Sequence, residues 1–265
     1  MMRNHHQTGF SLMELIGVMA VLAILSAALA PSVFELINDA YAKQEQENLD
    51  SLAADLRRLI ETERRIPSSN RANWSGALAA FSDLPASRVL SNERGFQRTL
   101  YFDPRFFTTS DSNFNGYTQT GGLSSAPISP RVMLISNLRA NAPQPAMNAA
   151  TFDQIWNQTS GATVVESDDI KITRLNLGDL FHRLTVTNTA TAQAGFSIEG
   201  GVIQALIAGN GVTDGISTRY LIEGSRVEFY GTPFPSGALN TVVVVNDSVG
   251  MRYATDGAAW YWEPL

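Results

Sequence analysis

The chain contains no cysteine, and this absence removes several classes of site at once. Without thiols it has no disulfide, no thiolate metal site and no cysteine nucleophile. The sequence also has no Gly-rich phosphate-binding loop, no HExxH zinc motif and no Gly-x-Ser-x-Gly nucleophile motif. A folded domain of this composition must be stabilised by its hydrophobic core, or by a bound ion.

Histidine and basic side chains are scarce. Of the three histidines, His5 and His6 lie near the N-terminus, and His182 lies beside a predicted strand, where we expect a structural role. Lys and Arg total 19 against 25 Asp and Glu, which gives a net charge of -6, and no basic block of the kind that follows a phosphate backbone is present. We therefore expect no enzymatic activity, no cofactor and no nucleic-acid partner.

One long apolar run stands out near the N-terminus. A polar leader ends at Gly9, and the run extends from Phe10 to Ala30, directly before Pro31. As a helix, these residues would rise about 31 Å at roughly 1.5 Å per residue, enough to cross a bilayer. The alternative is a secretory signal peptide cleaved behind Ala28-Leu29-Ala30. The abrupt start of the run and the single arginine of the leader disfavour that alternative.

A single carboxylate, Glu14, lies inside this apolar run. A charged side chain in a hydrocarbon environment costs several kcal/mol unless a partner meets it, so such residues are rare and functional. No lysine or arginine occurs near Glu14 in the predicted helix. The sequence therefore predicts that Glu14 pairs with a cation from outside its own helix.

The helical pattern continues beyond Pro31. Apolar residues recur with the spacing of an amphipathic helix that buries one stripe, at Leu49, Leu52, Ala53, Leu56, Leu59 and Ile60. Glu45 is expected on the polar faces, and Pro67 places the helix end near Ile66. Pro31 removes a backbone hydrogen bond, which predicts a kink. The alternative is that Pro31 ends one helix and Leu36 lies in another.

The remainder of the chain has the pattern of a β-rich domain. Period-two or β-branched runs predict strands at 131–135, 170–175, 184–187, 226–230 and 241–245. Thr151 to Gln158 is predicted to be a short helix, and the aromatic segment 258–264 a final strand covering the core. The polar region from about 103 to 151 is expected to form long surface loops.

These patterns predict an α+β fold, with a long N-terminal membrane-spanning helix packed on an antiparallel β-rich globular head. The predicted division is a leader at 1–9, a long helix at 10–66 and a β-rich head at 67–265. Within the helix, residues 10–30 form the transmembrane half and residues 31–66 the amphipathic half.

The segment Asp111 to Gly116 matches the first half of a calcium-binding loop. The complete loop requires a glutamate at its twelfth position, where this chain has Gly122. A polar loop in which the Asx side chains bond their own backbone is therefore favoured. Calcium bound with help from a distant carboxylate is the alternative.

The N-terminal motif carries a family resemblance. The stretch Gly9-Phe10-Ser11-Leu12-Met13-Glu14-Leu15-Ile16, with its apolar continuation and Pro31, resembles the signal of type IV pilins and type II secretion pseudopilins over roughly residues 1 to 35. The resemblance implies that a membrane aspartyl peptidase cuts after Gly9 and N-methylates Phe10. It further implies that Glu14 is the assembly glutamate.

The resemblance predicts a structural, non-enzymatic subunit of a pilus-like or pseudopilus fibre. The implied partners are other pilin or pseudopilin subunits, the prepilin peptidase and an inner-membrane assembly platform. The implied location is the bacterial inner membrane, crossed once, with the head in the periplasm. The missing disulfide favours the secretion-type relatives, and a large head favours a minor subunit. The alternative is a membrane-anchored or tip-displayed binding module.

Overall fold

The structure is a computed structural model that describes residues 12–64, 66–67, 71–108, 117–119, 130–138, 145–201, 203–206, 215–231, 238–255 and 259–265. The chain divides into two compact units, Met1–Gln44 and Glu45–Leu265. The long helix α1, Leu12–Glu63, contributes its first part to the first unit and its second part to the second unit.

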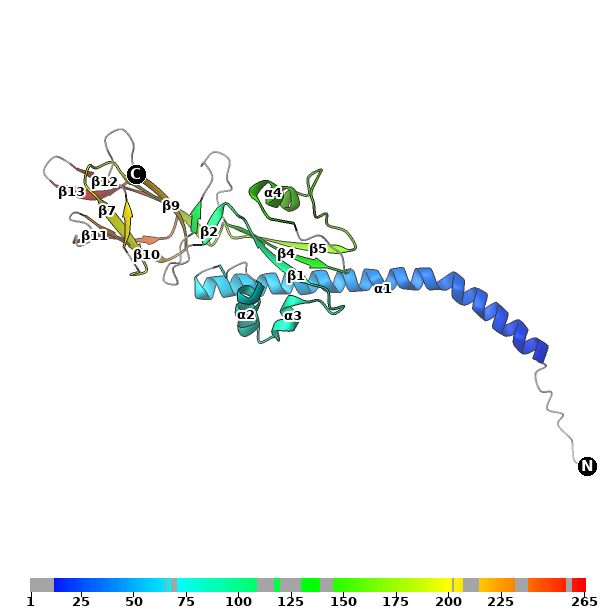
Figure 1. Ribbon diagram of the computed structural model, residues 1–265. Coiled ribbons are helices and arrows are strands. Elements are labelled where there is room, and N and C mark those ends of the chain that lie inside the picture. The colour runs from blue at the N-terminus through cyan, green and yellow to red at the C-terminus, as the bar shows by residue number, and fades with distance from the viewer. Residues whose placement is uncertain are drawn as a thin grey trace, which may run out of the picture. The chain divides into compact units, whose positions relative to one another are not determined.

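Three shorter helices and thirteen strands follow α1 among the described residues (Figure 1). The helices are α2 (Arg71–Ser82), α3 (Ala86–Leu90) and α4 (Ala149–Asn157). The strands are β1 (Arg98–Phe102), β2 (Phe106–Thr108), β3 (Tyr117–Gln119), β4 (Arg131–Asn137), β5 (Ile170–Asn176), β6 (Phe181–Asn188), β7 (Ala194–Ile198), β8 (Gln204–Leu206), β9 (Gly215–Ile222), β10 (Ser225–Tyr230), β11 (Leu239–Val245), β12 (Val249–Thr255) and β13 (Trp260–Pro264).

The second part of α1 packs against an antiparallel sheet with strand order β1-β4-β5. The predicted apolar stripe is buried there, and Leu49, Leu56 and Ile60 are all fully buried. They share one core with Trp74 of α2 and Val132 of β4. Helix α4 covers the other face of the sheet, through Phe152 and Ile155 among others. The predicted stripe and short helix are thus confirmed.

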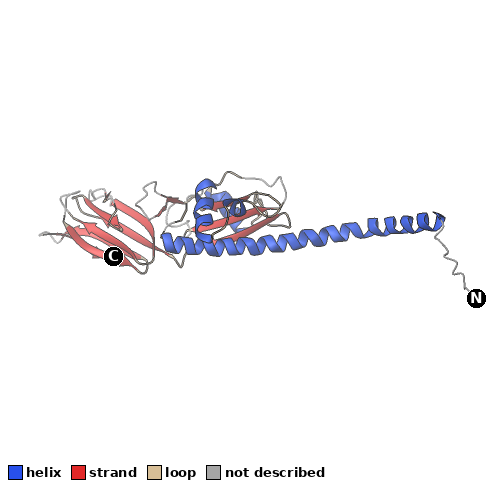
Figure 2. Ribbon diagram, turned by 90° about the horizontal axis from the view of Figure 1, so that it is seen from below, coloured by secondary structure: helices blue, strands red, loops and turns tan. Residues whose placement is uncertain are grey.

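A β-sandwich forms the rest of the second unit. One sheet has the strand order β13-β12-β6-β9-β3-β2 and the other the order β11-β10-β7-β8. Figure 2 shows these strands beyond the C-terminal end of α1 and the β1-β4-β5 sheet alongside the helix. The sandwich has its own core, which includes Phe196, Phe229, Tyr253 and Trp262. The expected α+β fold is therefore confirmed, with one parallel pair, β6 and β12, among antiparallel ones.

Glu45 lies in the core of the head, which corrects its expected place on a polar face of the helix. Its side chain is 3% exposed and pairs with Arg98 of β1, which is 4% exposed. The guanidinium Nε and Nη2 each donate to one carboxylate oxygen of Glu45 at 2.7 Å. The Arg98 Nη1 donates to the carbonyl oxygens of Arg88 and Ser91. The pair therefore connects α1, β1 and the segment around α3.

Helix α1 ends at Glu63, before the predicted end at Ile66. Arg64 has a φ of 56°, a left-handed conformation that terminates a helix. Its Nη2 donates to the Glu223 carbonyl and to Ser225 Oγ, both at 3.1 Å, and it forms an ion pair with Glu199 at 3.4 Å. Contacts with the sandwich thus hold Arg64 in the conformation that ends the helix.

The region from 103 to 151, expected to form long surface loops, contributes a charged network to the head. Asp103 is fully buried and accepts from Arg105 at 2.9 Å and from Arg131 at 2.8 Å. The same two arginines bind Asp153 of α4 at 2.7 and 2.5 Å. Two cations thus bind two carboxylates and hold α4 on the sheet.

Removing one member of the Glu45–Arg98 pair should destabilise the head strongly. We expect Glu45→Ala to lower the free energy of unfolding by about 3–5 kcal/mol, because Arg98 would remain as an unpaired buried charge. The matched control is Glu61→Ala, whose half-exposed pair with Arg57 is worth about 0–1 kcal/mol. Urea unfolding of the full chain in detergent, followed by the fluorescence of buried Trp74, measures both. Equal losses for the two variants would contradict this assignment.

The contacts of Asp153 predict that the folded head loses stability at acidic pH. Burial alone would raise the pKa of Asp153, but hydrogen bonds from Arg105 and Arg131 outweigh it and lower that pKa. The unfolded chain, with an ordinary aspartate pKa of about 3.9, therefore binds protons first as the pH falls. The stabilisation that Asp153 provides is complete above the pKa of the unfolded chain. It is lost as the pH falls through the lowered pKa of the folded chain.

We measure the free energy of unfolding in urea at neutral and at strongly acidic pH. We expect it to fall less in Asp153→Asn than in the native chain. Asp168→Asn is the control, because its side chain is 92% exposed. An unchanged pH dependence in Asp153→Asn would contradict the role of this carboxylate.

Candidate functional site

The described part of the first unit, residues 12–44 of α1, begins with an apolar portion whose large side chains are exposed. Leu12 and Met13 are 76% and 80% exposed, and most other large apolar residues up to Ile37 are more than half exposed. An 18-residue window has a mean hydropathy of 2.4, and none of it is buried. Length and composition thus suffice to cross a membrane. An exposed apolar surface of this kind marks contact with lipid or with other protein.

Glu14 lies in the first turn of α1. A carboxylate in this position interacts favourably with the partial positive charge at the N-terminus of a helix. The predicted cleavage residues Gly9 and Phe10 lie outside the described residues, so cleavage between them and methylation of Phe10 stay predictions.

Pro31 lies inside α1, and the helix continues through it. This excludes the alternative in which Pro31 ends one helix and Leu36 lies in another. Next to it, Ser32 Oγ donates to the Leu29 carbonyl at 2.9 Å, a local side-chain bond to the helix backbone. The kink at Pro31 stays a prediction.

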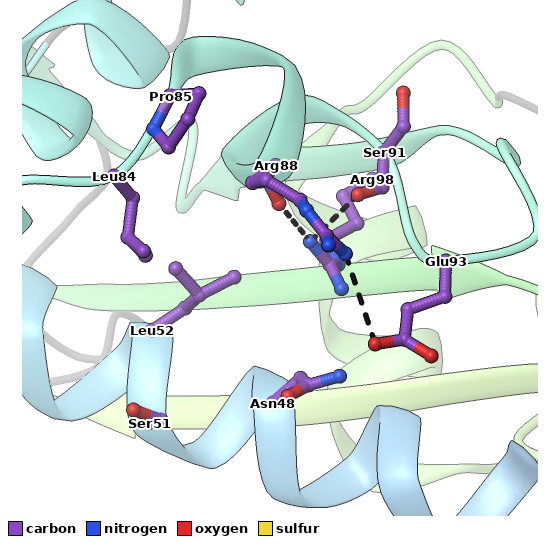
Figure 3. A pocket seen from close by; sticks show the side chains of 9 residues that line it. All are labelled: Asn48, Ser51, Leu52, Leu84, Pro85, Arg88, Ser91, Glu93 and Arg98. Atoms are coloured by element: carbon purple, nitrogen blue, oxygen red, sulfur yellow. Dashed lines mark hydrogen bonds and ion pairs between the residues drawn. The ribbon is translucent and has the colours of Figure 1, made fainter.

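A groove of about 340 Å³ lies on the second unit beside the Glu45–Arg98 pair. Asn48, Ser51 and Leu52 of α1 form one wall, and Leu84, Pro85, Arg88, Ser91, Glu93 and Arg98 complete the lining (Figure 3). Arg88 forms an ion pair with Glu93 at 3.7 Å, and Arg98 donates to the Ser91 carbonyl at 2.9 Å. Arg98, which also pairs with Glu45 of α1, thus holds the α3 segment beside the helix, whereas the Arg88–Glu93 pair lies within that segment.

Two further candidates for chemistry in the sequence are the calcium-like segment and His182. The described residues contain no group of three or more His, Asp or Glu side chains able to hold a metal ion. The calcium-like segment, Asp111 to Gly116, lies outside the described residues, so calcium binding there stays a prediction. His182 lies in β6, where its buried Nε2 has no hydrogen-bond partner in the described part of the chain.

One comparison with known proteins bears directly on the N-terminal segment. Residues 4–30 match the family model of the prokaryotic N-terminal methylation motif. This motif is the prepilin-type cleavage and methylation signal of type IV pilins and pseudopilins. No curated protein and no solved structure matches the chain. The resemblance inferred from Gly9 to Ile16 is thus confirmed, and the motif indicates a type IV pilin-like or pseudopilin precursor.

The family match and the exposed apolar surface of α1 cover the same segment of the chain. The matched residues 4–30 include Glu14 and most of the exposed apolar helix. The pilin-type signal and this helix fit membrane anchoring and suggest assembly with other pilin subunits. We therefore take the apolar N-terminal part of α1, with Glu14, as the candidate functional site.

Proposed function

We propose that this chain is a minor structural subunit, without enzymatic activity or cofactor, of a type IV pilus-like or type II secretion pseudopilus fibre. Prepilin peptidase removes the leader after Gly9 and methylates Phe10, and an inner-membrane platform assembles the product through its apolar helix. The head lies in the periplasm before assembly. The observation that carries this proposal is the methylation motif at residues 4–30, which runs into a helix whose apolar side chains are exposed.

The chemistry of Glu14 supports assembly through this helix. Cleavage before Phe10 would create an α-ammonium group at the start of the helix, at membrane depth. In a stack of subunits, Glu14 of one copy meets the ammonium group of a neighbour, and the two charges form a charge-assisted pair in an apolar setting. Because either charge alone is costly there, the pair favours one axial offset between neighbouring subunits.

The size of the head supports a minor position. Besides the three-stranded sheet that packs on α1, the head carries a sandwich of six-stranded and four-stranded sheets. A head of this size is easier to accommodate at the end of a fibre than at every step of a tightly wound one. We therefore place the subunit at the tip or in the priming complex.

A second function is a membrane-anchored or tip-displayed binding module. The observation that favours it is the separate core of the sandwich, which is distinct from the core shared with α1. The two functions differ in what they require of the helix. An anchor needs only apolar length, whereas a fibre subunit also needs the carboxylate of Glu14.

Substituting Glu14 separates the two functions. We expect Glu14→Ala to leave membrane insertion and leader removal intact but to reduce incorporation into the fibre by more than tenfold. Leaving a buried charge unpaired costs about 3–5 kcal/mol, and about 1.4 kcal/mol corresponds to a factor of ten. Quantitative immunoblots of sheared fibres and of membranes measure both quantities.

The matched control is Glu35→Ala, an exposed carboxylate on the same helix beyond Pro31. It should be incorporated like the native chain. If Glu14→Ala enters fibres as well as Glu35→Ala does, the assembly role of Glu14 is refuted and the anchored module is favoured.

A further inference from the structure

We draw no further inference here: the strongest candidate, the groove between α1 and the α3 segment, carries none, because its buried cation Arg98 is already bound by Glu45 and by backbone carbonyl oxygens, its exposed pair Arg88–Glu93 is closed on itself, and nothing in the structure shows what fills it.

Discussion

A single helix must satisfy two different environments, and the rest of this molecule depends on that constraint. In its first part, α1 exposes apolar side chains on all sides, as Leu12 and Met13 illustrate. In its second part it buries only one stripe, which forms the centre of the core that includes Leu49 and Leu56. The first part requires lipid or other helices around it, and the second is inseparable from the head.

The second of these environments, the core of the head, begins at the buried ion pair between Glu45 and Arg98. Glu45 is the first residue of the compact second unit, and its partner belongs to the first strand of the sheet that α1 packs against. Because a buried charge is tolerated only beside its partner, the pair fixes how helix and sheet meet. Both polar and apolar contacts thus hold this part of α1 in the head.

The sequence predicted the elements that depend on local pattern. The spacing of apolar residues predicts the strands β4, β10 and β11 and the helix α4, and the stretch from Gly9 to Ile16 indicates the methylation motif. The burial of Glu45 was also encoded locally. It lies four residues before Leu49 and seven before Leu52, on the apolar stripe, but its charge suggested a solvent-exposed face.

Other features depend on contacts distant in sequence and could not be predicted from pattern. The end of α1 at Glu63 depends on how Arg64 bonds Glu223 and Ser225, more than 150 residues away. The parallel pairing of β6 with β12 and the division into two sandwich sheets depend on strand order, which local spacing does not specify. Helix α2 lies in the segment predicted to be β-rich, although Trp74 and Leu78, which are both buried, have the four-residue spacing of a helix.

The proposed fibre role depends most directly on the new N-terminus that processing would create beside Glu14. The decisive measurement is the intact mass and N-terminal peptide of the protein extracted from the membranes of its native host. We expect a chain that begins at Phe10 and carries one additional methyl group on its amine. A chain that retains Met1, or one that begins at Pro31, would contradict the fibre role and would indicate a plain anchored or exported protein.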